Sequence, residues 1–151
     1  MDLYSVNTKN FKRAFVLVAI GSVMAVLASY FIGKSGLFFA PVIGISRKIT
    51  FPLLLLMFIA ATWYGRTLRK RLTAMGQIED FELKVQEYEK IYRARLQWNL
   101  IACLILCLLF ILTGRNFFFY FSILQFLLIL PFFPNAALFK RELKNDEIIL
   151  Y

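Results

Sequence analysis

Few residues of this sequence could do chemistry, and their types exclude several classes of site. The chain of 151 residues contains no histidine, which excludes a histidine-ligated haem, a typical catalytic zinc site and a His-based triad. Cys103 and Cys107 lie four residues apart in an apolar segment. On one helix face they are poorly placed for a mutual disulfide, and apolar surroundings leave a thiol unreactive. We therefore expect packing cysteines, no metal and no cofactor.

One charged segment partly resembles an enzyme motif. Glu89, Lys90 and Arg93 are similar to the start of the cytoplasmic signature E-R-x-x-R-x-x-x-N-x-x-E-N of membrane-associated eicosanoid and glutathione metabolism proteins. Gln97 stands where the first Asn of that signature belongs, and no Glu-Asn pair follows. The sequence therefore supports no membership in that family, and a lipid-modifying enzyme has only this short match in its favour.

The composition indicates a membrane protein. Hydrophobic residues make up 60% of the chain and charged residues 18%, whereas soluble domains have more charge and less apolar content. A helix needs roughly 17 to 25 apolar residues to cross the hydrocarbon core. Four uncharged segments meet this length and predict an all-α integral membrane protein with four transmembrane helices: residues 14–33, 49–65, 96–114 and 116–139. The length of the first favours a signal anchor over a cleavable signal peptide.

The charged residues indicate the orientation of these spans. With the N-terminus in the cytoplasm, most of the 18 Lys and Arg residues and all 9 Asp and Glu residues fall on the cytoplasmic side. The positive-inside rule then predicts that both termini are cytoplasmic, in a plasma or bacterial inner membrane. Trp63, Tyr64 and Trp98, at the inner ends of spans two and three, agree with an aromatic belt. Topology thus explains the net charge of +9, and no nucleic-acid binding is expected.

Residues 65–97, between the second and third spans, predict a cytoplasmic helical hairpin. The spacing of Leu68, Leu72 and Met75 prolongs the second helix, and Gly76 ends it. A second apolar stripe, which runs into the third span, has more apolar residues than this short stripe can cover. If the hairpin is a simple stalk, the neighbouring helix or an identical subunit covers this stripe. Otherwise the excess is a contact for a second copy or a partner protein, through Ile78, Phe81, Val85, Tyr88 and Tyr92.

A basic cluster follows the second span directly. It lies at the predicted membrane surface, where each cation near anionic lipid contributes on the order of 1 kcal/mol. Positive-inside topology alone would also account for it. The candidates for contact with lipid headgroups are Arg66, Arg69, Lys70 and Arg71.

Other residues are candidates for helix packing. Gly21, Ala25 and Ser29 recur at intervals of four and form a small-residue face, which permits close approach of another helix or of a second protomer. Asn99 and Gln125 are the best candidates for hydrogen bonds between helices.

Two further segments flank the spans. The apolar loop 34–48 is too short to cross and is expected to lie in the outer interface, as a short helix or a re-entrant turn. Pro131 and Pro134 predict a kink or an early exit of the fourth span. The tail 140–151 ends in apolar residues, which we expect to pack on the cytoplasmic hairpin.

The spans offer little chemistry. None contains Asp, Glu, Lys, Arg or His, the residues that mark most proton relays and charged-substrate paths in membranes. We therefore expect a non-enzymatic oligomeric scaffold or accessory subunit that acts through its cytoplasmic hairpin, with membrane lipids and a second copy or a membrane protein as partners. The alternatives are a small channel or carrier for neutral or lipidic molecules and a membrane-embedded lipid-modifying enzyme.

Overall fold

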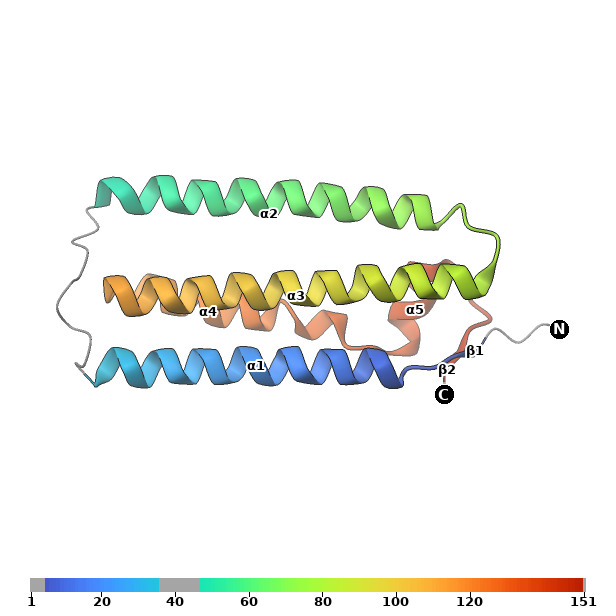
Figure 1. Cartoon of the computed structure of the whole chain (residues 1–151), viewed down its shortest axis with the longest axis horizontal. Helices are drawn as coiled ribbons and strands as arrows, with labels where there is room; N and C mark the ends of the chain where they lie inside the picture. Colours follow the sequence, from blue (N-terminus) through green and yellow to red (C-terminus); the bar gives the residue numbers. More distant parts are fainter. Residues whose placement is uncertain (1–4, 36–46, 151) are drawn as a thin grey trace.

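The computed structural model describes residues 5–35 and 47–150, with side chains from residue 51 onward in the second range. Most of these residues are helical (Figure 1). The predicted loop 34–48 lies mostly outside them. The elements are β1 (Ser5–Val6), α1 (Lys9–Lys34), α2 (Arg47–Met75), α3 (Phe81–Thr113), α4 (Asn116–Leu127), the 3-10 helix η1 (Leu130–Phe132), α5 (Ala136–Leu143) and β2 (Ile149–Leu150).

Three helices of the described chain are long and apolar enough to cross a membrane: α1, residues 51–75 of α2, and α3. Each contains most or all of one of the first three predicted spans. α3 has 33 residues, so it is about 50 Å long at a rise of about 1.5 Å per residue. A hydrocarbon core of about 30 Å would leave the remainder of α3 outside the membrane.

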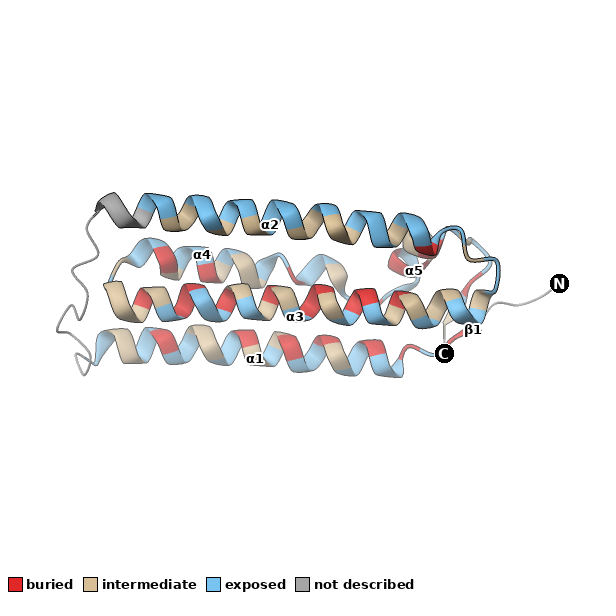
Figure 2. Cartoon of the chain, turned by 45° about the horizontal axis from the view of Figure 1, so that its top comes forward, coloured by how far each residue is buried: buried red, intermediate tan, exposed pale blue. Residues whose placement is uncertain are grey.

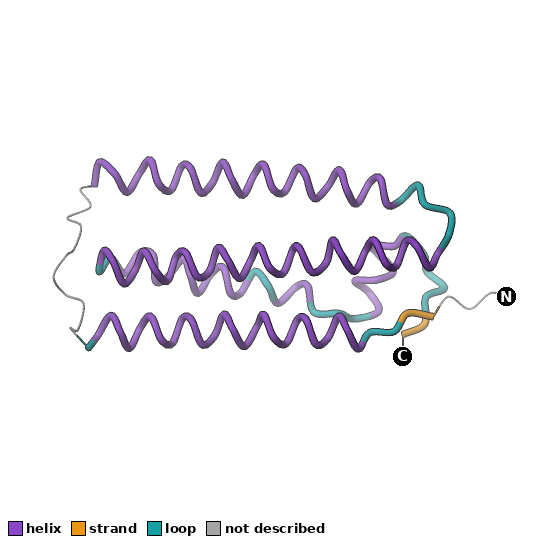
Figure 3. Tube along the Cα trace, viewed as in Figure 1, coloured by secondary structure: helices purple, strands orange, loops and turns teal. Residues whose placement is uncertain are grey.

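The last predicted span, residues 116–139, does not form one straight helix. α4 has 12 residues, and the chain bends by 80° before α5 (Figure 3). Pro131 and Pro134 lie at the break, where the missing N–H groups and the fixed ring geometry end the helix. The predicted kink is confirmed. Because 12 helical residues extend only about 18 Å, a fourth crossing stays a prediction.

The turn between α2 and α3 lies where the sequence predicted it. α2 ends at Met75, and the backbone N–H of Gly76 donates to the carbonyls of Leu72 and Thr73. The Asp80 carboxylate then caps α3 by accepting hydrogen bonds from the first backbone N–H groups of that helix, which would otherwise lack partners. Gly76 therefore follows the end of α2, and the Asp80 cap marks the start of α3.

α3 is the central helix and packs against α1, α4, α2 and α5. The small-residue face of α1 meets α3: a Cβ added at Gly21 would lie 3.5 Å from Leu100, and one at Gly33 only 2.7 Å from the Phe110 ring. Ser29, on the same face, is buried. The face therefore serves an internal helix contact, one of the two possibilities that its pattern allowed.

Both ends of the described chain meet at one end of the bundle, called the termini end below, beside the turn between α2 and α3 (Figure 1). There β1 and β2 pair in parallel, with Ser5 opposite Ile149. Rings from three segments fill the space behind this sheet: Phe11 lies 5.0 Å from Phe139 and 5.2 Å from Tyr92, measured between ring centroids. The tail thus joins β1 through β2, and its Ile148 is buried in the same cluster as Tyr88 and Tyr92.

Candidate functional site

An apolar groove of about 590 Å³ runs between α2 and α4, with α3 as its floor. Large side chains such as Phe58 and Phe121 line it, and so do the small side chains of Ala61 and Ala102. Gln125 supplies the only side-chain amide among the described lining residues. The volume of the groove lies within the range of roughly 300 to 1,000 Å³ that is usual for small-molecule sites.

α2 forms a wall of this groove and contributes little to the core. Among residues 51–75, only Met75 is buried. Figure 2 shows that the buried residues concentrate on α3 and on the helices behind it, while α2 remains exposed or half-buried. The side of α2 that does not touch α3 is therefore left uncovered by the described part of the chain.

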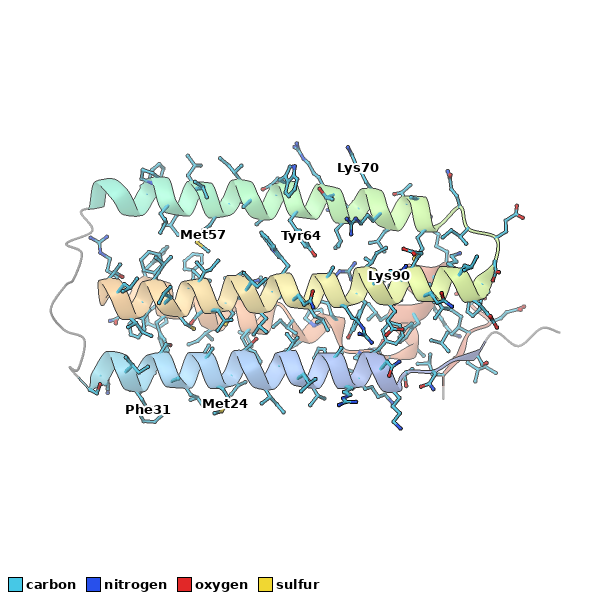
Figure 4. The ribbon with its side chains drawn as sticks, viewed as in Figure 1. Met24, Phe31, Met57, Tyr64, Lys70 and Lys90 are labelled. Atoms are coloured by element: carbon cyan, nitrogen blue, oxygen red, sulfur yellow. The ribbon has the colours of Figure 1, made fainter. Side chains whose placement is uncertain are left out.

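A stacked pair of rings, one of which lines the groove, lies at its end nearer the termini. Tyr64 of α2 and Trp98 of α3 lie 4.4 Å apart between centroids, with an interplanar angle of 12°, and Figure 4 shows Tyr64 between the two helices. The Tyr64 hydroxyl is buried, with no hydrogen-bond partner among the described residues. Arg71 and Arg95 lie close enough to act on it electrostatically. A donor without an acceptor thus stands beside two cations at the end of the groove.

The two amide residues predicted to bond between helices do so. The Gln125 amide donates from Nε2 to Oδ1 of Asn99 at 2.7 Å. Asn99 in turn donates from Nδ2 to the backbone carbonyl of Arg95 at 2.8 Å. These bonds fix α4 to α3 beside the groove, and they satisfy polar groups that an apolar interior would otherwise leave unpaired.

A buried ion pair lies next to this network. Arg95 donates to both carboxylate oxygens of Glu142 at 3.0 and 3.2 Å, and the two side chains are 7% and 11% exposed. The guanidinium also stands over the Phe132 ring, 4.6 Å from its centroid. The hydroxyl of Tyr92 donates to the Phe132 carbonyl at 2.8 Å. Together these contacts hold the bent segment and α5 against α3.

Neither partner of this ion pair is predicted from the sequence, because the charge pattern places Arg95 and Glu142 in solvated cytoplasmic segments. A signal for Arg95 is present in the apolar stripe. The alternating steps of three and four that lead to Tyr88 and Tyr92 continue to Arg95 and then to Asn99. Continued by two steps, the pattern places both polar residues on the buried face of α3.

The apolar stripe predicted to contact a partner is covered within the chain. Tyr88 and Tyr92 are 0% exposed, and Ile78, Phe81 and Val85 are half-buried against the same cluster. Helix α5 and the first residues of α1 cover the apolar residues that the short α2 stripe cannot cover. They take the place of the second protomer that the pattern suggested. A contact with another protein through Tyr88 or Tyr92 would require this cluster to open.

The predicted lipid-contact residues are all exposed. Arg66, Arg69, Lys70 and Arg71 form no ion pair within the described part of the chain. Lys70 points away from α3 (Figure 4). These side chains are therefore accessible to an anion at the end of α2.

The residues of the weak enzyme match pair with one another or with neighbours on the surface. Arg93 forms an ion pair with Glu89, and Lys90 forms one with Glu87. Cys103 and Cys107 are free and buried, and the Cys103 thiol donates to the Ser122 carbonyl at 3.8 Å. The cysteines thus serve as packing residues, and the Glu89 and Arg93 side chains lie outside the groove.

Comparisons of the chain with known protein families, with curated proteins and with solved structures found no match. A functional proposal must therefore come from the geometry of the groove and its surroundings.

Proposed function

We propose that this protein is a non-enzymatic integral membrane protein, with both termini in the cytoplasm, that binds a lipidic molecule in the groove between α2 and α4. The groove itself carries the proposal, since its lining is apolar and aromatic and its volume suits an acyl chain or a molecule of similar size. This is the carrier-type function that the sequence left as an alternative.

The placement of the ends supports the topology. β1 and β2 pair in parallel, so both ends of the described chain lie at one end of the bundle. Three membrane crossings alone would leave the two ends on opposite sides of the membrane. The return of the chain through α4 and η1 brings them to the same side. The positive-inside distribution of Lys and Arg assigns this end to the cytoplasm. α5, after the bend, then lies at the membrane surface.

A photoreactive phospholipid with its diazirine in the acyl chain tests the binding function. With the full chain in membranes, we expect cross-links to concentrate on Leu54 and Phe58 of α2 and on Phe121 of α4. Ala61→Trp fills the groove and is expected to remove these cross-links. Ala28→Trp, at an exposed alanine of α1, is the matched control and is expected to leave them unchanged. Uniform labelling around α1 and α2, unaffected by Ala61→Trp, would disprove groove binding.

A scaffold function through the hairpin is the second candidate, favoured by one observation. Leu83 is 52% exposed near the start of α3, close to the half-buried Phe81. Native mass measurement and cross-linking in mild detergent test this function, with Leu83→Ser as the variant. A complex that Leu83→Ser weakens would support the scaffold, and a chain that is monomeric without partners would exclude it.

A further inference from the structure

We propose that the occupant of the groove is an acidic phospholipid, whose acyl chain lies between α2 and α4 and whose phosphate lies at the basic end of α2. This inference rests on the function proposed above and deepens it. The register of α2, the charge at its end and two buried donors without partners support it.

The register of α2 connects the groove with the basic cluster. Phe51 and Phe58 line the groove, and Arg69 follows them by 18 and 11 residues. At 3.6 residues per turn, these spacings place the three side chains on one side of the helix. Eleven residues correspond to about 16 Å, so Arg69 lies beyond the Tyr64–Trp98 stack. A lipid aligned with α2 would therefore have its chain beside Phe58 and its headgroup beside Arg69.

The charge of α2 fits an acidic headgroup. The helix contains no Asp or Glu, and Arg66, Arg69, Lys70 and Arg71 are exposed without ion pairs in the described part of the chain. Arginine binds phosphate through paired N–H donors. No acid on the same helix neutralises these cations, and Glu87 of α3, which lines a small pocket with Arg71, pairs with Lys90. A neutral ligand would have no negative charge to pair with these cations.

Two buried donors lie close enough to each other to interact electrostatically, one on α2 and one on α3. The Tyr64 hydroxyl and the Nε of Arg95 have no hydrogen-bond partner among the described residues, although Arg95 is only 6% exposed. Arg95 precedes Ala102 of the groove by seven residues, hence two turns along the same side of α3. Unpaired buried donors are unfavourable. Ester and phosphate oxygens of a phospholipid are acceptors of the kind that both donors lack.

The test measures lipid binding to the delipidated full chain by native mass spectrometry. Phosphatidylglycerol and phosphatidylcholine with identical acyl chains are compared, so that only the headgroup differs. We expect the chain to bind phosphatidylglycerol more tightly. The double variant Arg66→Gln/Arg69→Gln is expected to reduce this preference by about fivefold for each arginine. Lys12→Gln/Arg13→Gln, which removes two exposed cations from α1, is the charge-matched control and should retain the preference.

A second pair of variants tests the tyrosine. Tyr64→Phe and Tyr88→Phe each delete a buried hydroxyl that has no partner among the described residues, so neither should lower the melting temperature. Only Tyr64→Phe is expected to weaken phosphatidylglycerol binding. Equal binding by both variants and the unchanged chain would remove Tyr64 from the headgroup site.

The outcomes separate the inference from the function on which it rests. If Ala61→Trp weakens the binding of both lipids but the unchanged chain binds them equally, the groove holds a lipid and the acidic headgroup is wrong. If the preference for phosphatidylglycerol falls equally in the two double variants, the cations of α2 act only through general charge, and the inference is overturned. If Ala61→Trp changes neither lipid, the groove function itself fails.

Discussion

Arg95 of α3 and Glu142 of α5 form a bidentate ion pair that is almost completely buried, although 47 residues separate them in sequence. The pair lies where the chain has turned back after the 80° bend. It therefore fixes the position of α5, whose residues Leu138 and Phe139 cover Tyr88. The ion pair thus adds a polar contact to the apolar packing by which α5 covers the stripe.

Removing the carboxylate should destabilise this end of the molecule strongly. Glu142→Ala leaves the Arg95 guanidinium buried without its counter-charge, a loss of about 3 to 5 kcal/mol in comparable sites. Thermal unfolding in detergent measures the effect, and faster proteolysis of α5 should accompany it. Glu147→Ala, at an exposed acid of the same tail, is the control. A loss as small as that of the control would mean that the ion pair does not hold α5.

The contact between Asn99 and Gln125 should show measurable coupling. A double-mutant cycle with Asn99→Leu and Gln125→Leu isolates the hydrogen bond between the two side chains. Interhelical hydrogen bonds in membrane proteins contribute roughly 0.6 kcal/mol on average and up to about 1.7, and we expect a value in this range. Unfolding in a denaturing detergent provides the four free energies. Strictly additive losses would contradict the bond.

The sequence predicted local features well because they depend on neighbouring residues. The stop at Gly76 and the break at Pro131 follow from backbone chemistry within a few turns, and the apolar stripe that carries Tyr88 and Tyr92 follows from spacing. What covers the two tyrosines could not be predicted, since it depends on the angle at which the chain leaves the bend. The groove was equally hidden, because Ala61 and Ala102 lie on different helices and leave a space only when α2 and α3 pack in this register.

Two glycine-to-alanine substitutions should have opposite effects. At Gly33 a new Cβ would lie 2.7 Å from the Phe110 ring, so α1 and α3 must separate or the ring must move, which typically costs about 1 to 3 kcal/mol. At Gly65 a new Cβ meets nothing within 4 Å, so Gly65→Ala should gain up to about 1 kcal/mol of helix propensity. Thermal unfolding of both variants tests the close contact between α1 and α3. Equal stability of the two would contradict it.

The buried tyrosines should make the protein sensitive to high pH. Burial raises the pKa of Tyr88 and Tyr92 above the ordinary value of 10.0, because the phenolate is unfavourable away from water. The folded state therefore keeps both protons while the unfolded state loses them, so the stability present below about pH 10 falls as the pH rises above it. Melting temperatures between about pH 8 and pH 11 measure this fall. Tyr88→Phe removes one ionisable group and should melt with a shallower pH dependence, whereas an identical dependence in this variant would mean that Tyr88 is not buried in the folded protein.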